Sequence, residues 1–94
     1  MLETNDYFDG NVKSIAFEST QCPATVGVMA AGEYQFSTAG REIMSVVSGT
    51  LKIKFAESND WQTFNTGDQF DVGANTQFGV IATVDTAYLC LYPA

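Results

Sequence analysis

The chain has 94 residues, of which 46% are hydrophobic and 16% charged, so it predicts one small globular domain over 1–94 and excludes a disordered chain. Four Lys and Arg residues against eleven Asp and Glu residues give a net charge of −7, which would repel a phosphodiester backbone or an anionic membrane. Neither nucleic acid nor a membrane is therefore expected as a partner. Histidine is absent, which excludes Ser-His-Asp and Cys-His catalysis and every His-ligated metal.

Short runs of alternating apolar and polar residues, each closed by a turn signal, predict an all-β domain without helices. In the second half of the chain, for example, Leu51 and Ile53 would face inward while Lys52 and Lys54 face solvent. Such closely spaced strands are typical of a sandwich or small barrel. In chain order, we predict strands over 12–17, 25–30, 33–38, 42–48, 50–55, 61–64, 69–72, 77–82 and 86–92.

Compartment and membrane signals are weak along the whole chain. The two cysteines, Cys22 and Cys90, show neither a CxxC spacing nor a disulfide-dense pattern, and the acidic first residues contain no apolar leader segment. The longest run without a polar side chain, 26–32, is far shorter than the ~20 residues of a membrane helix. We therefore expect a cytoplasmic protein.

The spacing of one glutamate and three glycines resembles the two motifs of the cupin β-barrel. Six residues separate Glu42 from Gly49, and five separate Gly67 from Gly73. Cupins place two histidines just before the glutamate and a third in the second motif. The residues that stand at those three positions here are Phe36, Thr38 and Phe78.

Of the usual cupin ligands, only Glu42 remains in this sequence. A single carboxylate does not hold a catalytic transition metal, because such sites need three or more protein ligands. We therefore expect neither a metal nor another cofactor.

A longer string of motifs runs through nearly the whole chain, from Met1 to Tyr92, and closely resembles the small bacterial pyrimidine/purine nucleoside phosphorylase family of single-domain cupins. The resemblance implies a cupin-type barrel and phosphorolysis: nucleoside plus inorganic phosphate would give the free base and α-D-ribose 1-phosphate, with phosphate as co-substrate. It also implies a broad range, including uridine, cytidine, thymidine, adenosine, guanosine and inosine. The motifs are NDYFDG at 5–10, VKSI at 12–15, VGVM at 26–29, GEYQFSTA at 32–39, SG at 48–49, DW at 60–61 and YLC at 88–90.

The turn between the third and fourth predicted strands is the candidate phosphate site. Its small residues expose backbone N–H groups, the hydroxyls of Ser37 and Thr38 can donate, and Arg41 can pair with an anion through two N–H groups. Lys13 is a second candidate cation. The alternative is an ordinary polar turn with one solvated arginine.

The barrel mouth near Tyr34, Thr38, Glu42 and Phe78 is the predicted pocket. Glu42 is the candidate catalytic residue, since a carboxylate there could hold ribose hydroxyls or stabilise positive charge near C1′. Phe36 and Phe78 could stack on a nucleobase, and Tyr34 could donate a hydrogen bond to the base or the sugar. Alternatively, the carboxylate is structural, the two phenylalanines only fill the core, and the tyrosine hydroxyl bonds to other groups of the protein.

Three other functions stay open at this point. A metal-free barrel could bind a sugar or nucleoside without transforming it, a metal-dependent isomerase or dioxygenase could use unforeseen ligands, and a solidly packed barrel could be purely structural. For the cupin-type phosphorylase a homodimer is expected, because pairing of two copies covers sheet edges that otherwise promote aggregation.

Overall fold

The computed structural model describes residues 2–94, which form ten β-strands in two antiparallel sheets. Within this part of the chain, no helix has the length and apolar character needed to cross a membrane. The strands are β1 (Thr4–Tyr7), β2 (Val12–Glu18), β3 (Pro23–Met29), β4 (Gly32–Ser37), β5 (Glu42–Ser48), β6 (Thr50–Phe55), β7 (Gln62–Asn65), β8 (Gln69–Val72), β9 (Gln77–Ala82) and β10 (Thr86–Leu91).

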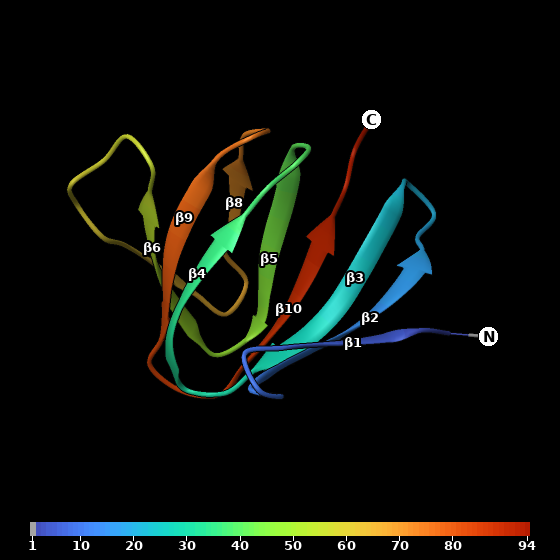
Figure 1. Cartoon of the computed structure of the whole chain (residues 1–94), viewed down its shortest axis with the longest axis horizontal. Coiled ribbons are helices and arrows are strands. Elements are labelled where there is room, and N and C mark those ends of the chain that lie inside the picture. Colours follow the sequence, from blue (N-terminus) through green and yellow to red (C-terminus); the bar gives the residue numbers. More distant parts are fainter. Residues whose placement is uncertain (1) are drawn as a thin grey trace.

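The two sheets have the strand orders β1-β2-β3-β10-β5-β8 and β4-β9-β6-β7. Figure 1 shows β4, β9 and β6 in one layer, with β5, β10, β3 and β2 in the other. From β3 onward every connection crosses from one sheet to the other except the β6-β7 hairpin, which is the strand order of a jelly roll, and the β1-β2 hairpin extends the larger sheet. The all-β prediction is confirmed, and each of the nine predicted strands corresponds to an observed one.

The first strand, β1, is the one element that the sequence pattern did not predict. Its residues Thr4 to Tyr7 are polar or exposed and show no alternation. The strand exists because it pairs with β2, in a register that sets Thr4 opposite Ile15 and Tyr7 opposite Val12. A two-residue periodicity reports burial on one face, so a strand that is held by edge pairing alone leaves no such pattern.

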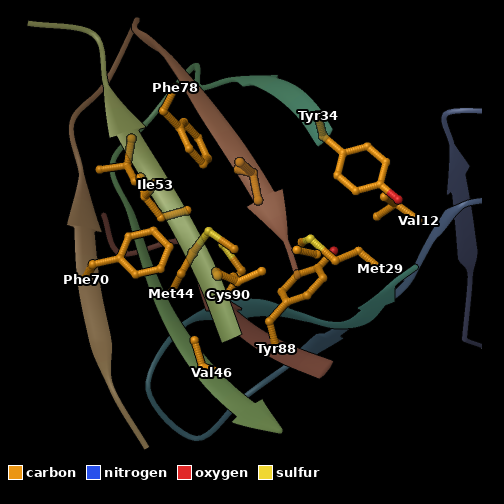
Figure 2. Packing of buried hydrophobic residues seen from close by; sticks show 14 residues of the cluster. Val12, Met29, Tyr34, Met44, Val46, Ile53, Phe70, Phe78, Tyr88 and Cys90 are labelled. Atoms are coloured by element: carbon orange, nitrogen blue, oxygen red, sulfur yellow. The ribbon is translucent and has the colours of Figure 1, made fainter. Parts of the chain in front are cut away.

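The core lies between the sheets and consists of the inward residues of both (Figure 2). On β6, for example, Leu51 and Ile53 are buried while Lys52 and Lys54 are exposed, as the alternation predicted. The aliphatic and aromatic side chains of this core drive the association of the sheets, because burial removes apolar surface from water.

One end of the barrel is closed by a tight contact between Gly49 and Thr86. Gly49, between β5 and β6, has a φ of +124°, and the Thr86 side chain occupies the space where a Cβ on residue 49 would lie. The fully buried Thr86 hydroxyl bonds to the carbonyl of Val84 at 2.9 Å and to the backbone N–H of Thr50 at 3.3 Å. These bonds satisfy the buried polar group, so this end of the barrel is tightly packed.

Candidate active site

A cavity of about 180 Å³ opens between the sheets where β4 ends and where β5 and β9 begin. Ligand pockets in proteins commonly measure roughly 300–1,000 Å³, so this cavity can enclose part of a nucleoside-sized molecule while the rest lies in its mouth. The lining residues are Tyr7, Ser14, Thr25, Met29, Phe36, Ser37, Glu42, Met44, Phe78, Tyr88, Cys90 and Tyr92.

The cavity lining combines buried apolar side chains with exposed polar ones. Met29, Met44 and Phe78 are buried, whereas Tyr7 and Ser37 are exposed. Figure 2 shows Met29, Met44 and Phe78 directed into the space between the two sheets. A ligand with a flat, weakly polar part and a hydroxylated part matches this combination.

Glu42, the first residue of β5, is the one carboxylate among the described residues that line the cavity. Burial raises the pKa of its carboxyl above the ordinary value, and a hydrogen bond from the Cys90 thiol offsets part of this rise. The Sγ of Cys90 donates to Oε1 of Glu42 at 3.4 Å. This contact holds the carboxylate against the inner face of β10 while its second oxygen is left for a ligand.

Several hydroxyls share the cavity with Glu42. Thr25 and Tyr92 share a hydrogen bond of 3.1 Å between their side-chain oxygens. Within residues 2–94, by contrast, the hydroxyls of Ser14 and Tyr88 have no protein partner, although both residues are buried. Since no fully buried side-chain oxygen in that range lacks a partner, both hydroxyls open into the cavity, where a ligand can reach them.

Four residues of the predicted site line this cavity: Glu42, Phe36, Ser37 and Phe78. The rings of Phe36 and Phe78 lie opposite each other on β4 and β9, with centroids 5.8 Å apart and planes inclined by 24°. They therefore form a stacked aromatic wall, and whether a base stacks on this wall stays a prediction.

Tyr34 and Thr38 face the barrel interior but lie outside the cavity lining. The Tyr34 hydroxyl donates to the Ala30 carbonyl at 2.6 Å. The Thr38 hydroxyl donates to the Gly73 carbonyl at 2.6 Å and accepts a bond from the backbone N–H of Thr76 at 3.2 Å. Both hydroxyls thus hold loop backbone in place, which is the alternative reading given to Tyr34 above.

Arg41 is held at the surface by Asp71. Its Nε and one terminal nitrogen donate to the two carboxylate oxygens at 2.8 and 3.0 Å, and both side chains are more than half exposed. The guanidinium lowers the pKa of the Asp71 carboxyl through the hydrogen bond and its charge. Arg41 therefore lies outside the cavity in this structure, paired rather than directed into it. Lys13, the second candidate cation, lies 3.5 Å from Asp6 at the surface.

The donor set of the cavity does not fit a cupin-type transition metal. In the part of the chain that the structure describes, no three residues among His, Cys, Asp and Glu are grouped so that they could hold a metal ion. Burial, together with the negative charge of Glu42, raises the pKa of Cys90 to about 12, so its thiol is protonated at neutral pH and is a poor ligand.

Most of the hydroxyls at this site lie at positions that the sequence patterns did not single out. Ser14, Thr25, Tyr88 and Tyr92 were not among the candidates. A signal was present for two of them, because Ser14 and Tyr88 stand in the motifs at 12–15 and 88–90, and Tyr88 shares a strand face with Cys90. Their convergence on Glu42 depends on the pairing of β2, β3, β10 and β5, which no local pattern specifies.

A family model and a similar protein carry the same name, and each matches nearly the whole chain. A family model described as "Pyrimidine/purine nucleoside phosphorylase" matches residues 2–92. A protein with that name from Pseudomonas putida (strain W619) is 62% identical over 92 residues, or 98% of each chain. A solved structure of a Vibrio parahaemolyticus protein of unknown function is 42% identical, with a TM-score of 0.94 over 98% of each chain. An RmlC-like cupin from Shewanella frigidimarina, 18% identical, reaches a TM-score of 0.75 over 99% of this chain and 85% of its own, which confirms the cupin-type fold.

Proposed function

The chain belongs to the pyrimidine/purine nucleoside phosphorylase family, and from this premise we propose that it cleaves both purine and pyrimidine nucleosides with inorganic phosphate. The products would be the free base and α-D-ribose 1-phosphate. One observation carries this proposal: the cavity brings aromatic and apolar walls together with the half-buried Glu42 and several hydroxyls. A nucleoside has the same two parts, a flat base and a hydroxylated sugar.

In the proposed binding mode, the base lies toward Phe78 and Met44 while the ribose lies beside Glu42. The carboxylate can accept hydrogen bonds from two ribose hydroxyls, which fixes C1′ relative to the incoming phosphate. As the bond from C1′ to the base breaks, positive charge develops on the ribose ring, and a nearby carboxylate stabilises that charge most effectively where water is excluded.

We propose that phosphate enters beside the turn that follows β4. Ser37 lines the cavity, and Arg41 lies only four residues further along the chain. The ion pair between Arg41 and Asp71 is exposed, and such pairs are held weakly. A phosphate dianion can therefore compete with Asp71 for the guanidinium of Arg41.

Replacement of the arginine tests this part. Arg41→Ala should raise the KM for phosphate severalfold and change the KM for nucleoside little, as measured by initial rates at varied phosphate. Lys54→Ala is the matched control, because it removes the same charge from the outer face of β6. If the arginine variant alters only nucleoside affinity, Arg41 does not bind the anion.

The reaction itself is tested by incubating metal-stripped protein with uridine or adenosine, with and without phosphate. Free base and ribose 1-phosphate should form only when phosphate is present, and a chelator should leave the rate unchanged. We propose this metal independence because the donor set of the cavity holds one carboxylate and a protonated thiol. Loss of activity that added metal restores would contradict it, and binding without turnover would favour a non-catalytic nucleoside-binding protein.

We also propose a homodimer. Four apolar side chains, Ile15, Val26, Val28 and Val47, are 40–56% exposed on the outer face of the larger sheet. Ile15 lies directly opposite Val26 in the register of β2 and β3, so the apolar surface is continuous there. Light scattering should give twice the chain mass for the wild type and a lower mass for Val26→Asp; a monomeric wild type would contradict the proposal.

A cytoplasmic location is proposed as well. Cys22 and Cys90 are both free thiols in the structure, which suits a reducing compartment. Fractionation of the source cells should recover the protein with the cytoplasmic fraction, and recovery outside the cytoplasm would contradict this location.

A further inference from the structure

Tyr88, on the inner face of β10, lies flat across the neighbouring strand at the inner end of the cavity. The register places Tyr88 opposite Gly27 of β3, and Gly27 opposite Ser14 of β2. A Cβ on Gly27 would come within 2.5 Å of both Cζ and Oη of Tyr88. The absence of a side chain at Gly27 thus makes room for the phenol, whose hydroxyl lies over β3.

The hydroxyl of Tyr88 is available to a ligand. No partner for it occurs within residues 2–94, and it opens into the cavity that also contains Glu42. Burial, with smaller contributions from Cys90, Tyr7 and Glu42, raises the pKa of Tyr88 to about 12. The phenol is therefore protonated at neutral pH and can donate a hydrogen bond.

Purine and pyrimidine bases differ at most of their polar edges but share one acceptor beside the glycosidic bond. This atom is N3 in a purine and O2 in a pyrimidine. When the bond between C1′ and the base breaks, its electron pair passes to the base, and part of the negative charge reaches this acceptor. A neutral donor at that place can therefore assist the departure of either class of base.

We propose, building on the phosphorolysis proposed above, that the Tyr88 hydroxyl donates a hydrogen bond to purine N3 or pyrimidine O2 and stabilises the departing base. An oxygen of hydrogen phosphate forms the new bond to C1′ as the bond from C1′ to the base nitrogen breaks. Tyr88 keeps its proton, and the proton carried by hydrogen phosphate ends on the released base, so the reaction balances.

The positions of the two polar groups match the two halves of a nucleoside. Cys90 follows Tyr88 by two residues on the same strand face, a step of about 7 Å along a β-strand. The Cys90 thiol contacts Glu42, so the carboxylate stands toward the mouth and the phenol toward the inner end. The ribose can reach Glu42 while the base reaches Tyr88, and a single donor then serves both classes of base.

The test is a double-mutant cycle between Tyr88→Phe and 3-deazaadenosine, in which a C–H group replaces N3. The phenylalanine keeps the ring over Gly27, so the barrel should stay folded, which circular dichroism checks. Tyr88→Phe should lower kcat/KM about 10- to 100-fold for uridine and adenosine. For 3-deazaadenosine the loss should be less than about threefold, because the wild-type enzyme makes no such bond to it.

Tyr92→Phe provides the comparison variant, since Tyr92 lies at the mouth and bonds to Thr25. It should change the rates with adenosine and 3-deazaadenosine by a common factor. The inference is overturned if Tyr88→Phe reduces both adenosine substrates equally, as a packing defect would, or reduces neither. If the wild type releases no base from any of these nucleosides, it is the proposed function that fails, and the two failures are thereby distinguished.

Discussion

Two of the hollows in the structure have opposite character, one inside the barrel and one on the outer face of the smaller sheet. The inner cavity measures about 180 Å³ and encloses Glu42 among buried side chains. The outer hollow is larger, at about 410 Å³, but Glu33 and Trp61 at its rim are exposed to solvent. Of these two hollows, volume alone would favour the outer one.

The chemistry of the two places favours the inner cavity. A carboxylate that is withdrawn from water interacts more strongly with developing charge, because the surrounding dielectric is lower and no water must reorganise. Burial raises the pKa of Glu42, whereas Glu33 stands on an exposed strand face. A small enclosed space with few directed polar groups is therefore the better candidate for catalysis than a wide open one.

The largest expected effect comes from replacing the carboxylate of the inner cavity, and the same replacement in the outer hollow serves as the comparison. Glu42→Gln should lower kcat/KM for uridine about 100-fold or more, because the amide cannot stabilise positive charge on the ribose. Glu33→Gln removes the same charge from the outer hollow and should leave kcat/KM within about twofold of wild type. Steady-state assays of the folded variants give both values, and equal losses would show that net charge matters rather than position.

A glycine beside each hollow gives the second contrast, Gly27 under the cavity residue Tyr88 and Gly79 in the outer hollow. Gly27→Ala would press a methyl group into the buried Tyr88 ring and should reduce the unfolding free energy by about 1–3 kcal/mol. At Gly79 the nearest atom to an added Cβ is the tip of Trp61, at 3.0 Å, and this side chain is 39% exposed and can move.

Gly79→Ala should therefore change stability by less than about 0.5 kcal/mol. Urea unfolding measures both differences. Similar losses at the two positions would mean that the inner wall is no more rigid than the outer one.

The smallest effect concerns the pH dependence of stability. Because burial raises the pKa of Glu42 in the folded protein, its protonated form is favoured there. The associated stabilisation is complete below the ordinary value of 4.5 and is lost as pH rises through the raised pKa. Neighbouring Cys90 and Tyr88 do not titrate in this range, since the pKa of each is raised to about 12.

Glu42→Gln stays neutral throughout, so it should gain stability relative to wild type between pH 4 and pH 7, by less than about 1 kcal/mol because the carboxyl is half exposed. Unfolding curves at the two pH values measure the gain. An opposite sign would mean that the ionised carboxylate is stabilised by the fold.

Much of the fold could be predicted because one face of most strands is buried. The alternation at 50–55 placed Leu51 and Ile53 in the core and the lysines outside, and the structure agrees. The pattern failed at Thr4 to Tyr7, where pairing with β2 rather than burial holds the strand. Patterning detects hydrophobic burial, so an edge strand without it leaves no trace.

The site was predictable only in part. The cupin spacing located Glu42, Phe36 and Phe78 at the cavity, since a motif preserves positions along neighbouring strands. The same spacing gave no indication that the hydroxyl of Thr38 would be taken up by backbone groups of a facing loop. Hydrogen-bond partners that are more than 30 residues apart depend on the packing of the two sheets.

By itself the sequence determined the strands of an all-β barrel, the loss of the cupin metal ligands and the presence of one carboxylate near the mouth. Only the tertiary structure decided that Tyr88 fills the space left by Gly27, that Arg41 pairs with Asp71 and that Ser14 opens into the cavity. The physical reason is that composition and periodicity express local preferences for burial. Contacts between strands are fixed by sheet register and by the volume that every neighbouring side chain leaves free.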